Sequence, residues 1–237
     1  GSRLNIRQTS YNFDSFARNA RIVQIDIDPA EMRKPTVRPH QALVADLRDI
    51  APLLLARAHD RRQPLPQRRA SWLQWIADRR QRYPLADPHL HSLRDQRINP
   101  YWFIETLFAH ARDNDIFVTG NASACILPFQ VGPIRRGTRL FSNSGSASMG
   151  YDIPAAIGAA FASPGQRVIC LAGDGSAQLN IQELQTIAHY QLPIKIVVLA
   201  NDGYLSIRSS QQNFFKRTSG ESPSSGVTLP DYVRVGA

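Results

Sequence analysis

The sequence lacks the features that mark several classes of protein. Its 237 residues include two cysteines, Cys125 and Cys170, both in apolar surroundings. Two isolated cysteines supply neither a disulfide framework nor the ligand spacing of a zinc site, so we expect both to be buried and the compartment to be the reducing cytoplasm. No apolar run approaches the roughly 20 residues that cross a bilayer, and the first residues lack the apolar stretch of a signal peptide, so no membrane association is expected.

Two further absences bear on function. No G-x-G-x-x-G motif follows any expected strand, which argues against a nicotinamide-dependent dehydrogenase. The net charge of +9 suggests nucleic acid at first, but much of the excess lies in one Arg-rich segment, residues 56–83, without an aromatic-basic ribbon or a known nucleic-acid module. We therefore expect a solvated helix there and no nucleic-acid partner. A noncatalytic scaffold that binds a partner through this segment stays open as an alternative.

The sequence does contain a regular alternation of short apolar, β-branched runs with segments of helical periodicity. Such alternation is typical of parallel strands covered by helices, so the fold class is expected to be α/β with doubly wound parallel sheets. The runs that predict strands lie at residues 20–28, 41–47, 115–120, 139–145, 166–175 and 193–202.

Changes in composition divide the chain. Residues 1–56 are expected to form part of a Rossmann-like central domain, and residues 57–98 an Arg-, Gln- and Pro-rich linker. Residues 99–237 are expected to form a second α/β domain, opened by a helix with Asn99 as its cap and Pro100 in its first turn. Since a helix starts within "LPDYVRVGA" at the end, we expect the sequence to be truncated at both ends.

Two turns follow neighbouring strands of the second domain. They are Gly-Asp-Gly at 173–175 and Asn-Asp-Gly at 201–203, with Asp174 and Asn201 separated by 201 − 174 = 27 positions. Loops at the carboxyl ends of parallel strands bind phosphate groups, which a carboxylate would repel unless a hard cation such as Mg²⁺ lay between them. Each turn alone is common, but the pair at this spacing indicates a site.

These residues resemble the thiamine-diphosphate-binding motif of the acetolactate synthase and pyruvate decarboxylase superfamily. The stretch "GDGSAQLNIQELQTIAHYQLPIKIVVLANDGY" is similar to acetolactate synthases, "SGSASMGYDIPAAIGAAFA" to the cofactor-domain signature, and "ARIVQIDIDPAEM" to the central domain. The resemblance covers nearly the whole chain. It implies part of the central domain followed by a truncated thiamine-diphosphate-binding domain.

The resemblance also implies the ligands of the cofactor. Mg²⁺ would be bound by the side chains of Asp174 and Asn201 and by the carbonyl of Gly203, and Met149 would prop the cofactor in a bent shape, the alternative being a methionine in the core. Gly175 and Ser176 would hold the diphosphate. The other implied cofactor-binding positions are Asn121, Ala122, Ala147, Gly173, Tyr204 and Leu205.

The activity implied is decarboxylation of a 2-keto acid with carboligation, in a homodimer or homotetramer. Another thiamine-diphosphate-dependent 2-keto acid decarboxylase is the alternative. No catalytic residue is expected within these residues, because the family's activating glutamate belongs to an N-terminal domain, so the chain alone is expected to be inactive. Ala147, Ala200 and the lack of tryptophan in residues 204–211 depart from the family pattern and leave the substrate open.

A weaker prediction concerns the first domain. In some members of the family the central domain holds FAD, and Asp26, Glu31 and Asp46 stand where such contacts occur. Asp26 ends an expected strand, where a carboxylate accepts hydrogen bonds from ribose hydroxyls. The alternative is a turn and helix start at Asp28-Pro29 without any ligand.

Overall fold

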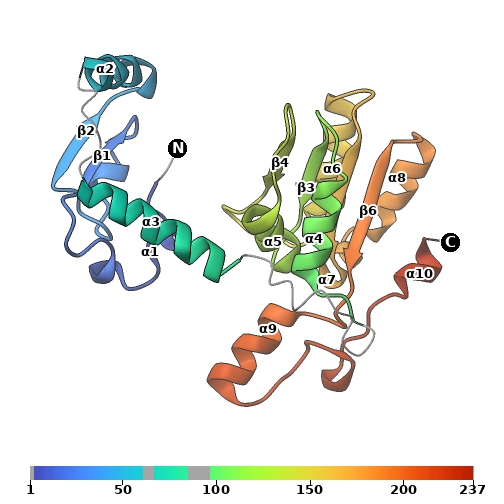
Figure 1. Cartoon of the computed structure of the whole chain (residues 1–237). Coiled ribbons are helices and arrows are strands. Elements are labelled where there is room, and N and C mark those ends of the chain that lie inside the picture. Colours follow the sequence, from blue (N-terminus) through green and yellow to red (C-terminus); the bar gives the residue numbers. More distant parts are fainter. Residues whose placement is uncertain (1–2, 61–66, 85–96, 237) are drawn as a thin grey trace. The chain divides into compact units, whose positions relative to one another are not determined.

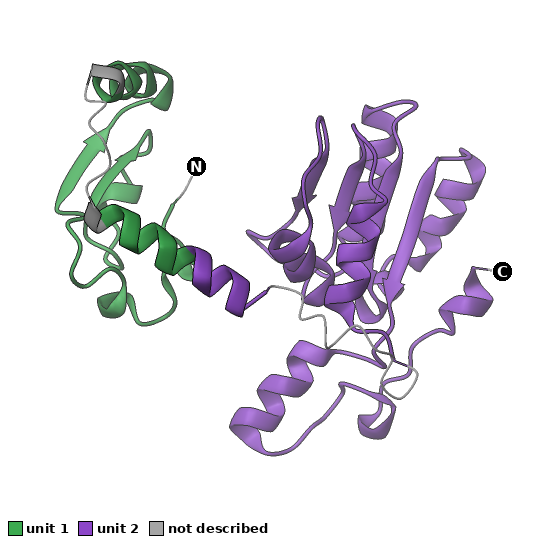
Figure 2. Ribbon diagram, in the orientation of Figure 1, with its two compact units in different colours: residues 1–76 green, residues 77–237 purple. Residues whose placement is uncertain are grey.

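The computed structural model describes residues 3–60, 67–84 and 97–236. It divides into two compact units, Gly1–Ile76 and Ala77–Ala237, and the division falls inside one helix (Figure 2). Each unit is described by itself.

The first unit contains a small parallel sheet. Strand β1 (Val23–Asp26) pairs with β2 (Gln41–Val44), with Val23 opposite Gln41 and Asp26 opposite Val44. Both strands lie where the sequence predicts them, and helix α2 (Leu47–Asp60) follows β2. The short elements around them are α1 (Ile6–Thr9) and the 3-10 turns η1 (Phe13–Ser15) and η2 (Glu31–Arg33).

This unit buries little apolar surface. Val37 is the one buried hydrophobic residue among its described positions, whereas Val44, Leu53, Leu54 and Leu55 are each more than half exposed. A two-stranded sheet offers few places where an apolar side chain is covered from both sides.

The Arg-rich segment contains helix α3 (Gln67–Arg82), as the sequence predicts. Trp72 and Trp75 lie three positions apart on it and stack with their ring centroids 4.9 Å apart. Both rings are about half exposed, which is consistent with a solvated helix. None of the described helices is both long enough and apolar enough to span a bilayer.

The second unit is built on a four-stranded parallel sheet in the order β4-β3-β5-β6 (Figure 1). Each strand coincides with a predicted one, and the α/β class is confirmed. The strands are β3 (Ile116–Thr119), β4 (Arg139–Ser142), β5 (Val168–Gly173) and β6 (Ile194–Leu199), and the helices between them are α4 (Pro100–Ala109), α5 (Ser123–Val131), α6 (Asp152–Ala162), α7 (Asp174–Gln178) and α8 (Leu184–His189), with the 3-10 turn η4 (Ile181–Glu183) before α8.

Helices cover both faces of this sheet, because the inner strands are apolar on both sides. On β5, Val168 and Cys170 pack toward α6, whereas Ile169 and Leu171 pack toward α4 and α5. On the second face Phe117 of β3 stacks on a phenylalanine of α4 with ring centroids 4.2 Å apart. The expected burial of both cysteines is confirmed.

Local signals fix where the helices of this unit begin. The Asn99 side chain accepts hydrogen bonds from the backbone N–H groups of Tyr101 and Trp102, and Pro100 occupies the first turn, as predicted for α4. Asp231 caps α10 (Tyr232–Val235) in the same way. The segment between β6 and α10 contains α9 (Leu205–Ser210), the π-helical turn η5 (Gln211–Phe215) and the 3-10 turn η6 (Pro223–Ser225).

The strand order places a topological switch point between β3 and β5. From β3 the chain goes to β4 on one side and then crosses to β5 on the other. In open parallel sheets, the loops that leave the carboxyl ends of two such strands diverge and form a crevice in which ligands bind. The loops in question are 120–122 after β3 and 173–176 after β5.

Candidate functional site

Asp174 connects the ends of β5 and β6. It is 3% exposed, and its carboxylate accepts hydrogen bonds from the N–H groups of Gly175 at 2.8 Å, Asn201 at 2.8 Å and Gly203 at 3.1 Å. The two turns that lie 27 positions apart in sequence therefore meet at one carboxylate. Because carboxylate oxygens accept several bonds, Asp174 can hold this loop and still bind a cation.

Asn201 supplies the clearest sign of a missing ligand. Its side-chain Oδ1 is buried and has no hydrogen-bond partner among the described residues. A buried amide oxygen without a partner costs free energy, so such an atom is usually satisfied by a ligand, an ion or water. An amide oxygen beside a carboxylate suits a hard cation such as Mg²⁺.

The protein offers few ligands to a cation near Asn201, so phosphate oxygens could complete its coordination. Within the described ranges, no group of three or more His, Cys, Asp or Glu side chains is arranged to hold a metal ion. A cation at this loop would depend on Asp174, the Asn201 amide, a main-chain carbonyl and exogenous oxygens. Mg²⁺ sites with one or two protein carboxylates and substrate phosphates have this composition.

The two glycines of the Gly-Asp-Gly turn differ in their surroundings. A Cβ added at Gly173 would meet no atom within 4 Å, so its backbone is open to close approach by a ligand. A Cβ added at Gly175 would lie 2.2 Å from Cε1 of Tyr204. Any larger residue at position 175 would therefore clash with the Tyr204 ring. At position 173, by contrast, the end of strand β5 has free space beside it.

Ser176 is engaged within the protein. It is 2% exposed, and its Oγ accepts the N–H of Gly150 at 2.8 Å and hydrogen-bonds the carboxyl group of Asp152. Its hydroxyl thus ties the loop after β5 to the start of α6. The contact of Ser176 with a diphosphate stays a prediction.

The remaining predicted positions lie on the loops around the same crevice. Asn121 donates from Nδ2 to the carbonyl of Ala147 at 3.0 Å, which joins the loops after β3 and β4. Ala122 and Ala147 have φ values of 50° and 52°, so both loops contain a left-handed turn. Met149 is 37% exposed and does not belong to either hydrophobic cluster, unlike the core methionine considered as an alternative.

Tyr232 of α10 packs against the hydrophobic cluster on the α6 side of the sheet and contacts the loop after β5. Its hydroxyl donates to the backbone carbonyl of Asp174. Burial, and then the negative charges of Asp174 and Asp152, raise the pKa of Tyr232 to about 12, so it stays protonated and keeps donating across the physiological range. Helix α10 is held to the site by this contact.

Asp152 is a fully buried carboxyl group at the switch point. Its Oδ1 accepts the N–H of Ile153 at 3.0 Å, whereas its Oδ2 has no partner among the described residues. A Cβ at Gly120 would lie 2.4 Å from Oδ2, so the residue at 120 must be glycine for Asp152 to fit. Burial raises the pKa of Asp152, although the hydrogen bonds from Ser176 and Ile153 partly offset it.

We predict that Asp152→Asn raises the stability of the protein at alkaline pH. Because the pKa is raised in the folded state above its ordinary value of 3.8, folded protein binds this proton more tightly, and stability falls as pH rises from that value through the raised pKa. Asparagine removes the buried charge, so a gain of about 1–3 kcal/mol is expected at pH 8. Thermal unfolding of both proteins from pH 3 to pH 8 measures it.

The pH dependence separates this effect from a change in packing. The difference in melting temperature should shrink as the pH falls toward 3, below the ordinary value of 3.8, where the carboxyl group of the parent is mostly protonated in both states. Leu or Ala at 152 would alter shape as well as charge and so makes a poorer comparison. A constant difference at all pH values would contradict the assignment.

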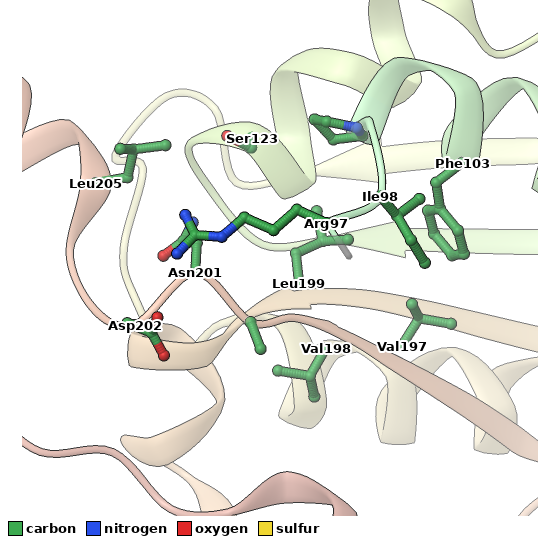
Figure 3. A pocket seen from close by; sticks show the side chains of 12 residues that line it. Arg97, Ile98, Phe103, Ser123, Val197, Val198, Leu199, Asn201, Asp202 and Leu205 are labelled. Atoms are coloured by element: carbon green, nitrogen blue, oxygen red, sulfur yellow. The ribbon is translucent and has the colours of Figure 1, made fainter. Parts of the chain in front are cut away.

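A pocket of about 490 Å³ adjoins the Asn201 loop (Figure 3). Its floor is apolar, from β6 and from Phe103 of α4, and Ser123, Asn201 and Asp202 add polar groups. Arg97 extends across it in the direction of Asn201 (Figure 3). Its volume lies within the range of small-molecule sites.

The three acidic residues considered for FAD are engaged within the first unit. Asp26 accepts the N–H of Asp28 at 3.0 Å, Glu31 pairs with Lys34 at 2.5 Å, and Asp46 pairs with Arg48 at 2.8 Å. Each carboxylate thus serves a turn or a local ion pair. No feature of the described residues singles out a flavin site.

Sequence reasoning did not find several residues of the site. Asp152, Tyr232 and the ion pair between Arg208 and Glu221 contact its loops from distant positions. Asp152 lies within the quoted cofactor-domain signature but was given no role, and the other three stand outside the quoted motifs. One signal was present: the pattern Ser-Pro-Ser-Ser at 222–225 is that of a capped turn, and the structure has a capping box there.

The family comparison agrees with this geometry. Residues 120–236, which include the loops after β3, β5 and β6, match the family described as "Thiamine pyrophosphate enzyme, C-terminal TPP binding domain". The chain therefore belongs, through this domain, to the thiamine pyrophosphate enzymes, and the resemblance inferred from its motifs is confirmed.

Its relatives include large subunits of acetolactate synthase. The chain is 37% identical over 215 residues to that of Porphyra purpurea, covering 91% of this chain and 35% of the relative. It is 34% identical over 236 residues to that of Cyanidium caldarium, 99% of this chain and 39% of the relative. It is 33% identical over 243 residues to the large subunit of acetolactate synthase isozyme 3 of Escherichia coli (strain K12), covering 99% of this chain and 40% of the relative. The chain thus spans well under half the length of these relatives.

Proposed function

We propose that this chain carries the Mg²⁺- and diphosphate-binding part of an acetolactate synthase-like enzyme that acts on a 2-keto acid. The names of the relatives support the reaction class. The single observation that supports the metal is the buried, unpartnered Oδ1 of Asn201 in a loop that the Asp174 carboxylate holds.

In this proposal different loops bind different parts of the cofactor. Asp174, Asn201 and the carbonyl of Gly203 hold Mg²⁺. Backbone groups of the loops after β3 and β5 hold the diphosphate, with Gly173 as the point of closest approach. The residues whose side chains or backbone would contact the rest of the cofactor are Asn121, Ala122, Ala147, Met149, Gly175, Ser176, Tyr204 and Leu205.

Bound thiamine diphosphate supplies an electron sink for decarboxylation of a 2-keto acid. The residues of this chain bind and orient it, and their charges and burial set the local electrostatics. Carboligation, a homodimeric or homotetrameric assembly and a cytoplasmic location remain parts of the proposal for the whole protein. The two buried free cysteines are consistent with a reducing compartment.

Calorimetric titration of the chain with thiamine diphosphate tests the proposal. Saturable binding that tightens at least about 10-fold with millimolar Mg²⁺ is expected, because a cation held by Asp174 and Asn201 would offset the repulsion between the carboxylate and the diphosphate. Thiamine without its diphosphate is the control and should not respond to Mg²⁺. Acetolactate formation is a poor readout here, since the resemblance assigns the activating glutamate to another domain. If thiamine diphosphate does not bind at any Mg²⁺ concentration tested, the proposal is overturned.

A further inference from the structure

A segment rich in serine and glycine folds back onto the Asn201 loop. Residues 219–226, which we name the clasp, contain Glu221, whose backbone carbonyl accepts the N–H of Tyr204 at 2.8 Å. A Cβ at Gly203 would lie 1.9 Å from that same carbonyl oxygen, so the clasp backbone is packed directly on the loop.

A buried ion pair joins the clasp to α9. The Glu221 side chain is 3% exposed and pairs with Nε of Arg208, whose own side chain is 25% exposed. Nη2 of Arg208 donates to the backbone carbonyl of Asp202 at 3.0 Å. One guanidinium therefore holds both the clasp and the loop that carries Asn201 and Gly203.

The clasp is also rigid in itself. Oε1 of Glu221 accepts the hydroxyl of Ser222 at 2.7 Å, and Oγ of Ser225 accepts the N–H groups of Glu221 and Ser222 at 2.9 and 3.0 Å. At its start, Ser219 exchanges two hydrogen bonds with the Gln211 side chain. A composition that suggests a flexible tail thus forms a closed set of hydrogen bonds.

The loop that the clasp touches contains two residues with positive φ, one of which, Asp202, is not a glycine. Asp202 has φ 60° and Gly203 has φ 130°, both in the left-handed half of the backbone map. Such conformations persist where the surroundings over-determine them. Asp174 restrains one side of the loop through two N–H groups, and the clasp with Arg208 restrains the other.

We propose that Arg208 and Glu221 are positioning residues for the cation site: their ion pair sets the orientation of the Asn201 amide and the Gly203 carbonyl before the cation arrives. This inference rests on the proposed function. A pre-set loop binds a cation without first ordering its own backbone, so loss of the pair should weaken the Mg²⁺-dependent part of cofactor binding specifically.

The test uses Arg208→Gln and Glu221→Gln, with Arg167→Gln as a matched control. The Arg167–Asp115 pair is buried to the same degree, with side chains 27% and 3% exposed, but it lies at the amino ends of β3 and β5. Two quantities are measured in each protein: hydrogen exchange of the Gly203 and Tyr204 amides without ligand, and the affinity for thiamine diphosphate with and without Mg²⁺.

Arg208→Gln and Glu221→Gln should each speed exchange of these amides about 10-fold or more and lower the affinity measured with Mg²⁺ by about 10–100-fold, the usual effect of losing an outer-shell partner. The affinity without Mg²⁺ should change little. Arg167→Gln should lower the melting temperature and leave both quantities as in the parent. Arg208→Lys keeps the charge and should restore part of the affinity.

The outcomes separate this inference from the proposed function. If the parent shows no Mg²⁺-dependent binding, the proposed function fails, and the inference with it. If the parent binds but the variants match it in Mg²⁺ dependence, only the inference is overturned. If the Gly203 and Tyr204 amides of Arg208→Gln exchange as fast as those of the parent, the ion pair does not restrain the loop, and the inference is overturned whether or not the cofactor binds. Equal losses with and without Mg²⁺ would indicate a general structural role and would also overturn it.

Discussion

Asp174→Ala is expected to abolish the Mg²⁺ dependence of thiamine diphosphate binding. The carboxylate is both a proposed cation ligand and the acceptor for the N–H groups of Gly175, Asn201 and Gly203. Since losing an outer-shell partner alone typically costs 10–100-fold in metal affinity, losing this group should cost about 100-fold or more. Calorimetric titrations with and without Mg²⁺ measure the loss.

The alanine variant also leaves three backbone donors without their acceptor, so part of its effect is structural. A hydrogen bond to a charged group contributes about 1.5–3 kcal/mol, and a fall in the melting temperature is expected as well. Asp174→Asn separates the two effects in part, because its single amide oxygen can still accept the N–H groups of Asn201 and Gly203 but carries no charge, while its NH2 group faces the N–H of Gly175. It should retain more stability than alanine and still lose the Mg²⁺ dependence.

Asp115→Asn provides the control for burial. Asp115 is 2% exposed, like Asp174, but it precedes β3 and pairs with Arg167 at the opposite end of the sheet. Its variant should lose stability and keep the Mg²⁺ dependence. Mg²⁺-dependent binding by Asp174→Asn equal to that of the parent would contradict the ligand role of Asp174.

Much of this fold could be predicted because its signals are local. Strands β3 and β5 are short buried runs with apolar side chains on both faces, and a glycine marks the end of each, Gly120 directly after β3 and Gly173 as the last residue of β5. The start of α4 follows from Asn99 and Pro100 alone. The neighbouring positions of Asp174 and Asn201 follow from the rule that parallel strands end at the same edge of a sheet.

What could not be predicted depends on strand order and on long-range contacts. The sequence does not state that β5 pairs with β3 rather than with β4, and this pairing is what creates the crevice. The contact of Tyr204 with Gly175, and that of Ser176 with Gly150, join segments that lie 29 and 26 positions apart by numbering (204 − 175 and 176 − 150).

The clasp shows the limit of reasoning from composition. Serine, glycine and proline are frequent in flexible segments, and "TSGESPSSG" has few apolar residues. The same residue types form capped turns when their hydroxyl groups find backbone partners, as Ser222 and Ser225 do. The partner that orders this segment is Arg208, more than ten positions earlier, which composition cannot indicate.

Gly203→Ala is expected to have the largest effect on stability. The position has φ 130°, which residues with a Cβ rarely adopt, and the added atom would lie 1.9 Å from a backbone oxygen of the clasp. Backbone strain and overpacking each cost about 1–3 kcal/mol, so a loss of roughly 2–6 kcal/mol is expected, or about 2–4 °C in melting temperature per kcal/mol. Thermal and urea unfolding measure it.

The clasp cannot yield as a flexible side chain would, because the clashing atom belongs to the backbone of Glu221. Either the clasp detaches or the loop changes its conformation, and in both cases exchange of the Tyr204 amide should become faster. Gly158→Ala is the control: its position in the middle of α6 has no atom within 4 Å of the added Cβ, so the free energy of unfolding should rise by about 0.5–1 kcal/mol.

Gly173→Ala distinguishes folding from binding, because its Cβ also meets nothing within 4 Å. It should fold like the parent but lose affinity for the diphosphate, and equal stability of Gly203→Ala and Gly173→Ala would refute the packing of the clasp on the loop.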